Sequence, residues 1–319
     1  MRLVTRPHAL AGTVFLFTVQ LLRADFTMGY EVSIDIPKGV LPELAQQLKN
    51  GAKTRLPQFL TLQARGDKGF FGTSKFKVIV DYPKQEVTII EPAGKRFATV
   101  AMKDYAEAVR AAMSPVPGQV VQALESSKPK FGINKTGRSQ NILGLPAEEY
   151  EAVFSIEPSA TLASRFHDPI AKTVLRLWIA SPEDLTRVGV SYYMDKLQWL
   201  ITNMNLVVLT QLGLGGLPGG GQEFTAAIDR LTKENALVVQ AELDVYAPTI
   251  AMVGQEMTRK EGDGPPPPLG NVIIAQVVAE LGGLSFDPIE DSDLDVPIGF
   301  AKVTPQEILS TPVAPAKPQ

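Results

Sequence analysis

The sequence contains no cysteine and only two histidines among its 319 residues. Without cysteine the chain can form no disulfide bond, thiolate nucleophile, cysteine metal site or lipidated cysteine. His8 falls in an N-terminal segment that we interpret below as a signal, which leaves His167 as the one histidine of the mature chain. Zinc sites that use two or three histidines are therefore excluded as well. We predict no metal and no cofactor.

The N-terminal segment, residues 1–24, has the pattern of a secretory signal peptide. Arg2 and Arg6 form a basic start, residues 9–22 are uncharged and mostly apolar, and Ala24 is a small residue suited to cleavage. The apolar stretch is shorter than the roughly 20 residues of a membrane-spanning helix. We expect a periplasmic or secreted protein that contacts the membrane only transiently, with an uncleaved anchor as the alternative.

Positive charge is also scarce once the signal is removed. Loss of Arg2, Arg6 and Arg23 from the 31 basic residues leaves 28 against 34 acidic residues, a net charge of −6. A protein with this balance lacks the basic surface that binds phosphate backbones, so we expect no nucleic acid partner.

The remaining sequence has the composition of a soluble globular protein, with 45% hydrophobic and 20% charged residues. Alternating apolar and polar residues predict about ten strands. Helical spacing, with proline and glycine at the boundaries, predicts a smaller number of helices. The strands are expected at 29–36, 59–66, 74–82, 86–92, 95–102, 130–137, 148–157, 172–180, 236–248 and 271–281, and the helices at 41–50, 103–113, 116–127, 190–212 and 222–234. We predict an α+β fold built on one curved antiparallel sheet with one solvated face.

A single domain accounts for this order of elements. We place it at 25–304, with a glycine-rich loop at 213–221 and a proline-rich loop at 261–270. The tail, residues 305–319, is rich in proline and is expected to be disordered.

The glycine-rich loop resembles a phosphate-binding loop but fails both tests for one. Pro218 breaks the third position of a dinucleotide-binding fingerprint. A Walker loop needs a lysine and a hydroxyl after its last glycine, but Gln222 and Glu223 follow Gly221. We interpret the segment as a connection between two helices.

The other candidate catalytic or metal sites also lack required residues. Ser164, His167 and Asp168 are close neighbours on one loop, which does not give the geometry of a catalytic triad. The acidic run 287–297 lacks the glycine and the bidentate glutamate of a calcium loop, and we interpret it as a solvated turn before a final short strand. We predict no catalytic residues.

Residues 192–209 form the most apolar helical segment of the chain. Its apolar side chains cover more than one face of the expected helix, which indicates extensive burial. Two interpretations remain open, burial in the protein's own core and a lid over a hydrophobic ligand.

The order of segments resembles an exported bacterial family whose domain has the half-barrel fold of the periplasmic lipoprotein carriers LolA and LolB. The matching segments cover about 26–304. They are GYEVSIDI (29–36), FKVIVDYPKQEVTIIEPAGKRFATV (76–100), NILGLPAEEYEAVF (141–154) before VLRLWIASPEDL (174–185), and SDLDVPIGFAKV (292–303) with Pro297, Gly299 and Phe300. Some relatives have a cysteine near 146–148, which this chain lacks, and the two long loops resemble insertions.

The resemblance implies an open half-barrel whose concave face is covered by helices or by a ligand. On this basis we expect a non-enzymatic binding protein that holds a lipid, an acyl chain or a lipoprotein. The alternative is a structural or interaction protein of the cell envelope whose cavity is filled by its own helices. The residues that we expect to face the ligand are Trp178, Tyr193, Trp199, Leu200, Met204 and Val207.

Overall fold

The computed structural model describes most of the region expected to form the domain. The described residues are 25–37, 40, 45–46, 49–50, 58–73, 76–112, 129–157, 169, 171–211, 226, 236–246 and 273–309, without the side chains of 129, 171 and 205–211. The predicted signal peptide, the helices expected at 116–127 and 222–234, both long loops and His167 lie outside the described residues or almost wholly so.

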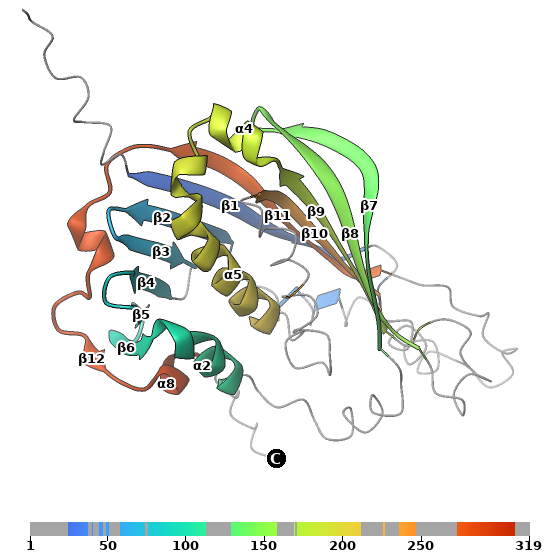
Figure 1. Ribbon diagram of the computed structural model, residues 1–319. Helices are drawn as coiled ribbons and strands as arrows, with labels where there is room; N and C mark the ends of the chain where they lie inside the picture. Colours follow the sequence, from blue (N-terminus) through green and yellow to red (C-terminus); the bar gives the residue numbers. More distant parts are fainter. Residues whose placement is uncertain are drawn as a thin grey trace, which may run out of the picture.

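The fold is α+β, as predicted, and its centre is one large open sheet of twelve strands (Figure 1). The strands are β1 Phe26–Asp35, β2 Phe59–Arg65, β3 Lys68–Gly72, β4 Lys77–Asp81, β5 Glu86–Glu91, β6 Arg96–Ala101, β7 Pro129–Ile142, β8 Leu145–Ile156, β9 Ala171–Ala180, β10 Leu237–Tyr246, β11 Ile273–Ser285 and β12 Ala301–Lys302. Their spatial order is β12-β6-β5-β4-β3-β2-β1-β11-β10-β9-β8-β7. All pairs are antiparallel except β12 with β6.

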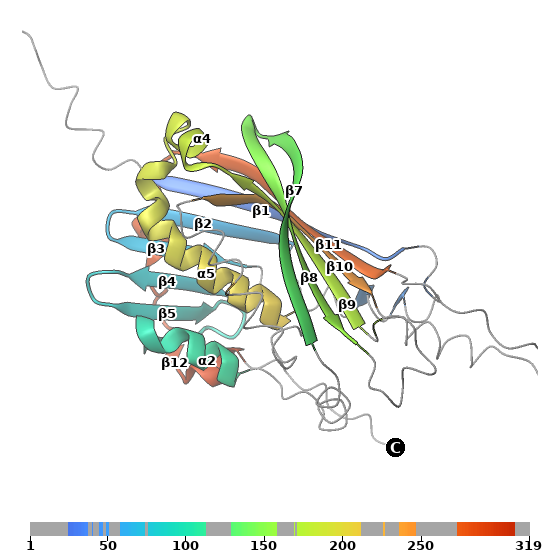
Figure 2. The ribbon, with the colours of Figure 1, turned by 45° about the vertical axis from the view of Figure 1, so that its right-hand side comes forward.

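Two runs of neighbouring strands, β1 to β6 and β7 to β11, meet where β1 pairs with β11. Thr27 lies opposite Ser285, and the register shifts near Gly29. Figures 1 and 2 show the strong twist of the resulting sheet. In the described part of the chain its two ends, β12 and β7, are not paired with each other, so the sheet remains open.

The strand count exceeds the expected number partly because β3 has no recognisable alternation. Its sequence is KGFFG, with two adjacent aromatic residues between glycines. Phe71 belongs to the core that α5 covers, while Phe70 packs with Ile289 on the other face of the sheet. Because both faces are buried here, consecutive apolar residues are accommodated where alternation would require a polar one.

The described helices are few. They are α2 Tyr105–Ala111, α4 Pro182–Arg187, α5 Met194–Gln211 and α8 Pro305–Leu309, with short 3-10 segments η2 Met102–Asp104, η3 Ser191–Tyr193 and η5 Asp291–Leu294. Helix α5 packs on β2 and β3, and α2 packs against both α5 and α8 (Figure 1). None of the helices within the described residues combines the length and apolarity needed to span a membrane.

The main apolar core lies between α5 and the sheet. Met194, Leu197, Leu200, Ile201 and Met204 are buried at helical spacing along α5, so they form one stripe that faces the strands. Ser181 begins α4 as an N-cap, because its hydroxyl accepts from the Asp184 N–H. The chain passes from β9 directly into α4 and then through η3 into α5.

The sequence analysis expected the opposite face of β3 to β5 to be solvated, but in the structure this face is covered. Phe70, Ile79 and Ile90 are buried there against Ile289 and Leu294, which come from the acidic stretch after β11. Asp291 and Asp295 of that stretch pair with Arg65 and Lys68. The acidic run thus covers the sheet with its apolar residues while its carboxylates contact basic side chains at the sheet surface.

Residues 305–309, assigned to the tail by the sequence analysis, form helix α8. Thr304 and Glu307 make a capping box, in which the Thr304 N–H donates to the Glu307 carboxylate at 2.8 Å. Ile308 is buried in the main core. An N-terminal capping signal and one buried side chain therefore extend the fold beyond 304, while 310–319 lie outside the described residues.

Candidate ligand-binding face

Five of the six residues proposed from the sequence to face a ligand belong to the main core or pack against it. Tyr193 is buried and stacks on Phe26 of β1, with ring centroids 4.9 Å apart and planes 16° apart. Parallel rings at this distance are a favourable aromatic pair. The contact fixes the N-terminal end of α5 to the middle of the sheet.

Further along α5, Trp199 is half-buried and its ring lies 5.4 Å from that of Tyr105 on α2. Leu200 and Met204 are buried in the same core. Leu200 and Tyr82 together leave little room at Gly69, because a Cβ there would lie 3.0 Å from the Leu200 Cδ1 and 2.9 Å from the Tyr82 hydroxyl. The helix thus packs closely on β3.

Tyr105 was not predicted from the sequence, although it lies at the centre of this packing. Its side chain is fully buried, and its hydroxyl has no hydrogen-bond partner among the described residues. Burial raises the pKa of Tyr105 well above its ordinary value. A buried tyrosine at the junction of two helices has no signature in the sequence beyond the helical spacing of its segment.

Of the other two proposed residues, Trp178 lies on a strand and not on the helix. Trp178 is buried on β9 and belongs to the main core cluster, but it alternates with Leu177 and Ile179, which belong to a separate cluster. Successive side chains of a strand point to opposite faces, so Trp178 lies across the strand from that second cluster. The side chain of Val207 lies outside the described residues.

The second apolar cluster lies on β8 to β11 and includes Leu175, Leu177, Phe154 and Leu243, all buried. Within the described part of the chain, every member of this cluster belongs to a strand, apart from Ala236 just before β10. Helix α5 by contrast contributes its buried side chains to the first cluster. The sheet therefore has a second apolar surface that the described helices do not share.

The reverse side of the same strands carries charge. Arg176 lies between Leu175 and Leu177 and pairs with Asp244 at 2.7 Å and with Glu242 at 2.8 Å. Gln276 donates to both carboxylates. Partial burial lowers the pKa of Arg176, but the hydrogen bond and charge of Asp244 outweigh it and raise the pKa above its ordinary value.

A neighbouring carboxylate extends this network. Glu149 is fully buried and accepts from Arg138 at 2.6 Å and from Thr136 at 2.8 Å. The carboxylates are therefore held by guanidinium, hydroxyl and amide donors. In the described residues no group of three or more histidine, cysteine, aspartate or glutamate side chains is arranged to hold a metal ion.

The described geometry thus offers apolar surface on one side of β8 to β11 and a hydrogen-bonded charge network on the other. No family model matches the sequence, and no curated protein matches it either.

Proposed function

We propose that the protein is an exported, non-enzymatic binding protein that holds a lipid, an acyl chain or a lipoprotein. In this proposal the twisted sheet is a half-barrel of the kind that the LolA and LolB resemblance implies, and its concave face carries the ligand beside α5. The observation that supports the proposal is the second apolar cluster, whose described members come almost entirely from strands.

The physical argument concerns the apolar surface of the sheet and what covers it. Removal from water stabilises a large apolar side chain by about 1.5 to 3 kcal/mol. Leu175, Leu177 and Phe154 are already buried within the protein. The apolar surface left for a ligand therefore belongs to their half-buried neighbours such as Ile133 and Val245. A sheet face of this kind needs an apolar covering layer. A bound acyl chain provides such a layer, and α5, packed over β2 and β3, forms one border of the site.

The alternative is a structural or interaction protein of the cell envelope whose apolar face is filled by its own helices. The burial of Tyr193, Leu200 and Met204 among residues of the sheet favours it, because these side chains already have partners within the protein. The two functions differ in whether ligand is present when the protein is isolated.

Native mass spectrometry followed by organic extraction distinguishes them. Protein purified from a bacterial periplasm should carry lipid in stoichiometric amount. The half-buried residues Ile133 and Val245 pack at the border of the second cluster, so the double variant Ile133→Gln/Val245→Gln should lose most of that lipid. Ile298→Gln, at a fully exposed side chain, is the control and should retain it.

Circular dichroism of each variant establishes that the fold is intact. Lipid-free parent protein that also fails to bind a fluorescent fatty acid would reject the carrier proposal and favour the envelope scaffold. Lipid retained equally by all three proteins would move the ligand away from the second cluster.

A further inference from the structure

A shallow pocket of about 310 Å³ opens over β1, β2 and β11. Thr27, Gly29 and Glu31 line it from β1, and they alternate along that strand with residues of the main core. Alternate side chains of a strand point to opposite faces. The pocket therefore lies on the outer face of the sheet, which we define as the face of β1 turned away from α5.

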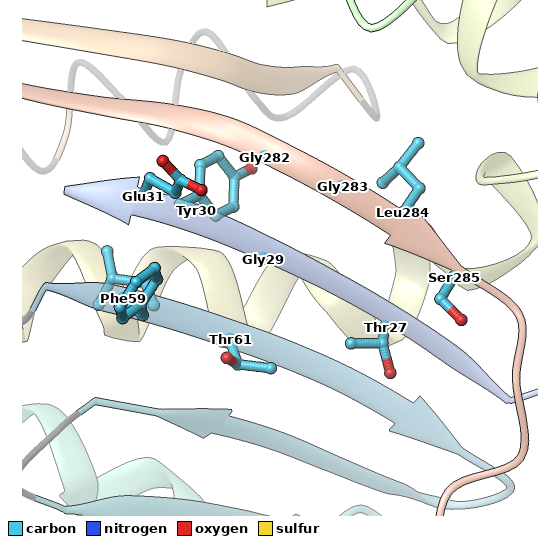
Figure 3. A pocket seen from close by; sticks show the side chains of 11 residues that line it. Thr27, Gly29, Tyr30, Glu31, Phe59, Thr61, Gly282, Gly283, Leu284 and Ser285 are labelled. Atoms are coloured by element: carbon cyan, nitrogen blue, oxygen red, sulfur yellow. The ribbon is translucent and has the colours of Figure 1, made fainter.

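The floor of the pocket is bare backbone. Gly29 of β1 lies opposite Gly283 of β11, and Gly282 occupies the irregularity in register beside them. Figure 3 shows these glycines in the middle of two neighbouring strands, with the side chains of Thr27, Thr61 and Ser285 standing around them.

Nothing within the described structure requires Gly29 or Gly283 to be glycine. Neither has a positive φ, and a Cβ added at either position meets no atom within 4 Å. Glycine inside a strand costs roughly 0.5 to 1 kcal/mol relative to alanine. Strand glycines often mark a place where a ligand or another backbone approaches closely. We attribute the missing side chains to an external group that rests on this floor.

The rim defines the chemistry of that group. Hydroxyls come from Thr27, Thr61 and Ser285, and Glu31 supplies a carboxylate. Phe59, the cross-strand neighbour of Glu31, is 60% exposed and presents its ring beside the floor. The pocket lining contains no lysine, arginine or histidine, which disfavours an anionic ligand such as phosphate.

We propose that this pocket binds a neutral saccharide ring. The flat glycine floor admits one face of a ring, and the exposed Phe59 offers an aromatic surface for its C–H groups. Glu31 and the hydroxyls of Thr27 and Thr61 can hydrogen-bond the ring's hydroxyls, whereas the Ser285 hydroxyl already donates to the Asp287 carboxylate at 2.6 Å. The volume falls at the lower end of the range typical of small-molecule sites, about 300 to 1,000 Å³. This site is independent of the acyl-chain proposal, because the two lie on opposite faces of the sheet.

Saturation-transfer NMR on the purified protein tests the proposal, with methyl β-glucopyranoside and cellobiose as saccharide probes, choline as the cation and inorganic phosphate as the anion. We expect signal from the saccharides alone. Gly29→Val places a side chain on the floor, where an added Cβ meets no atom within 4 Å, and should weaken binding at least tenfold. The control is Gly132→Val on β7, where an added Cβ also meets nothing within 4 Å, and it should bind like the parent.

Thermal melting of each variant verifies folding. If Gly29→Val fails to fold, Phe59→Ser replaces it, because a side chain that is 60% exposed contributes little to the core, and it should weaken binding by a similar factor. Saccharide binding unaffected by either variant, or signal from choline or phosphate in place of the saccharides, would overturn the assignment.

Discussion

At the scale of single residues, Arg176 lies among several carboxylates on one face of the sheet. It is one guanidinium between Glu242 and Asp244, and Asp244 is only 2% exposed. A buried carboxylate that loses its partner remains charged in a medium that solvates it poorly. Arg176 therefore neutralises groups that the sheet could not otherwise bury.

Replacement of Arg176 by methionine keeps an unbranched apolar stem and removes the guanidinium group with its charge. We expect Arg176→Met to lower the free energy of unfolding by about 3 to 5 kcal/mol, because Asp244 is left buried without its guanidinium partner. Urea denaturation at pH 7 measures the loss. Arg187→Met is the control, because Arg187 is 62% exposed in its pair with Asp184, and such surface pairs contribute at most about 1 kcal/mol. Equal losses in the two variants would contradict a special role for Arg176.

At the scale of elements, α8 is a short helix that belongs to the fold, although the sequence analysis assigned its residues to a disordered tail. Proline-rich sequence after 310 suggested disorder from Pro305 onward. The capping box of Thr304 and Glu307 is a recognisable signal, but a helix of five residues is too short to be identified by periodicity. Its burial against α2 and β6 is a tertiary contact that local sequence does not contain.

If α8 is part of the core, truncation of its buried side chain should be costly. We expect Ile308→Ala to destabilise the protein by about 2 to 5 kcal/mol, since it opens a cavity among buried residues. Chemical denaturation provides the measurement. Ile298→Ala makes the same chemical change at a fully exposed position and should alter stability by less than about 0.5 kcal/mol. A cost at Ile308 no larger than at Ile298 would show that α8 does not dock.

At the scale of the whole molecule, buried tyrosines are expected to lower the free energy of unfolding as the pH becomes alkaline. Burial raises the pKa of Tyr30 and of Tyr105 above the ordinary value of 10.0. The unfolded chain therefore releases these protons first, so the stabilisation is complete below pH 10 and declines as the pH rises further. Each tyrosine contributes a slope of up to about 1.4 kcal/mol per pH unit.

Urea denaturation between pH 8 and pH 11 should show this decline, and Tyr105→Phe should make it shallower. Tyr105 is the better target, because its hydroxyl has no partner among the described residues, whereas Tyr30 donates to the Val238 carbonyl at 2.7 Å. Tyr192→Phe, at a side chain that is 68% exposed, should follow the parent curve. A Tyr105→Phe curve as steep as the parent's would refute the explanation.

Local pattern predicted much of this architecture, because β1 alternates between apolar and polar residues and strands such as β5 and β9 are short apolar runs rich in branched side chains. Local pattern could not predict which strands are neighbours in the sheet. The pairing of β1 with β11 depends on a register that no short segment encodes. The apolar spacing of α5 predicted burial of Leu200 and Met204, but the glycine pocket needed the structure, because Gly29 and Gly283 become neighbours only through that long-range pairing.

The central position of β1 also has a consequence for how the chain folds. The Ile289 N–H donates to the Asp25 carboxylate at 2.7 Å across 264 residues of sequence, and β1 lacks its second neighbour until β11 has been synthesised. Closing a loop of this length costs conformational entropy before any contact between β1 and β11 can form. We therefore expect the pairing of β1 with β11 to be a slow step of folding. Until then the nascent chain presents an unpaired strand edge of the kind that chaperones protect.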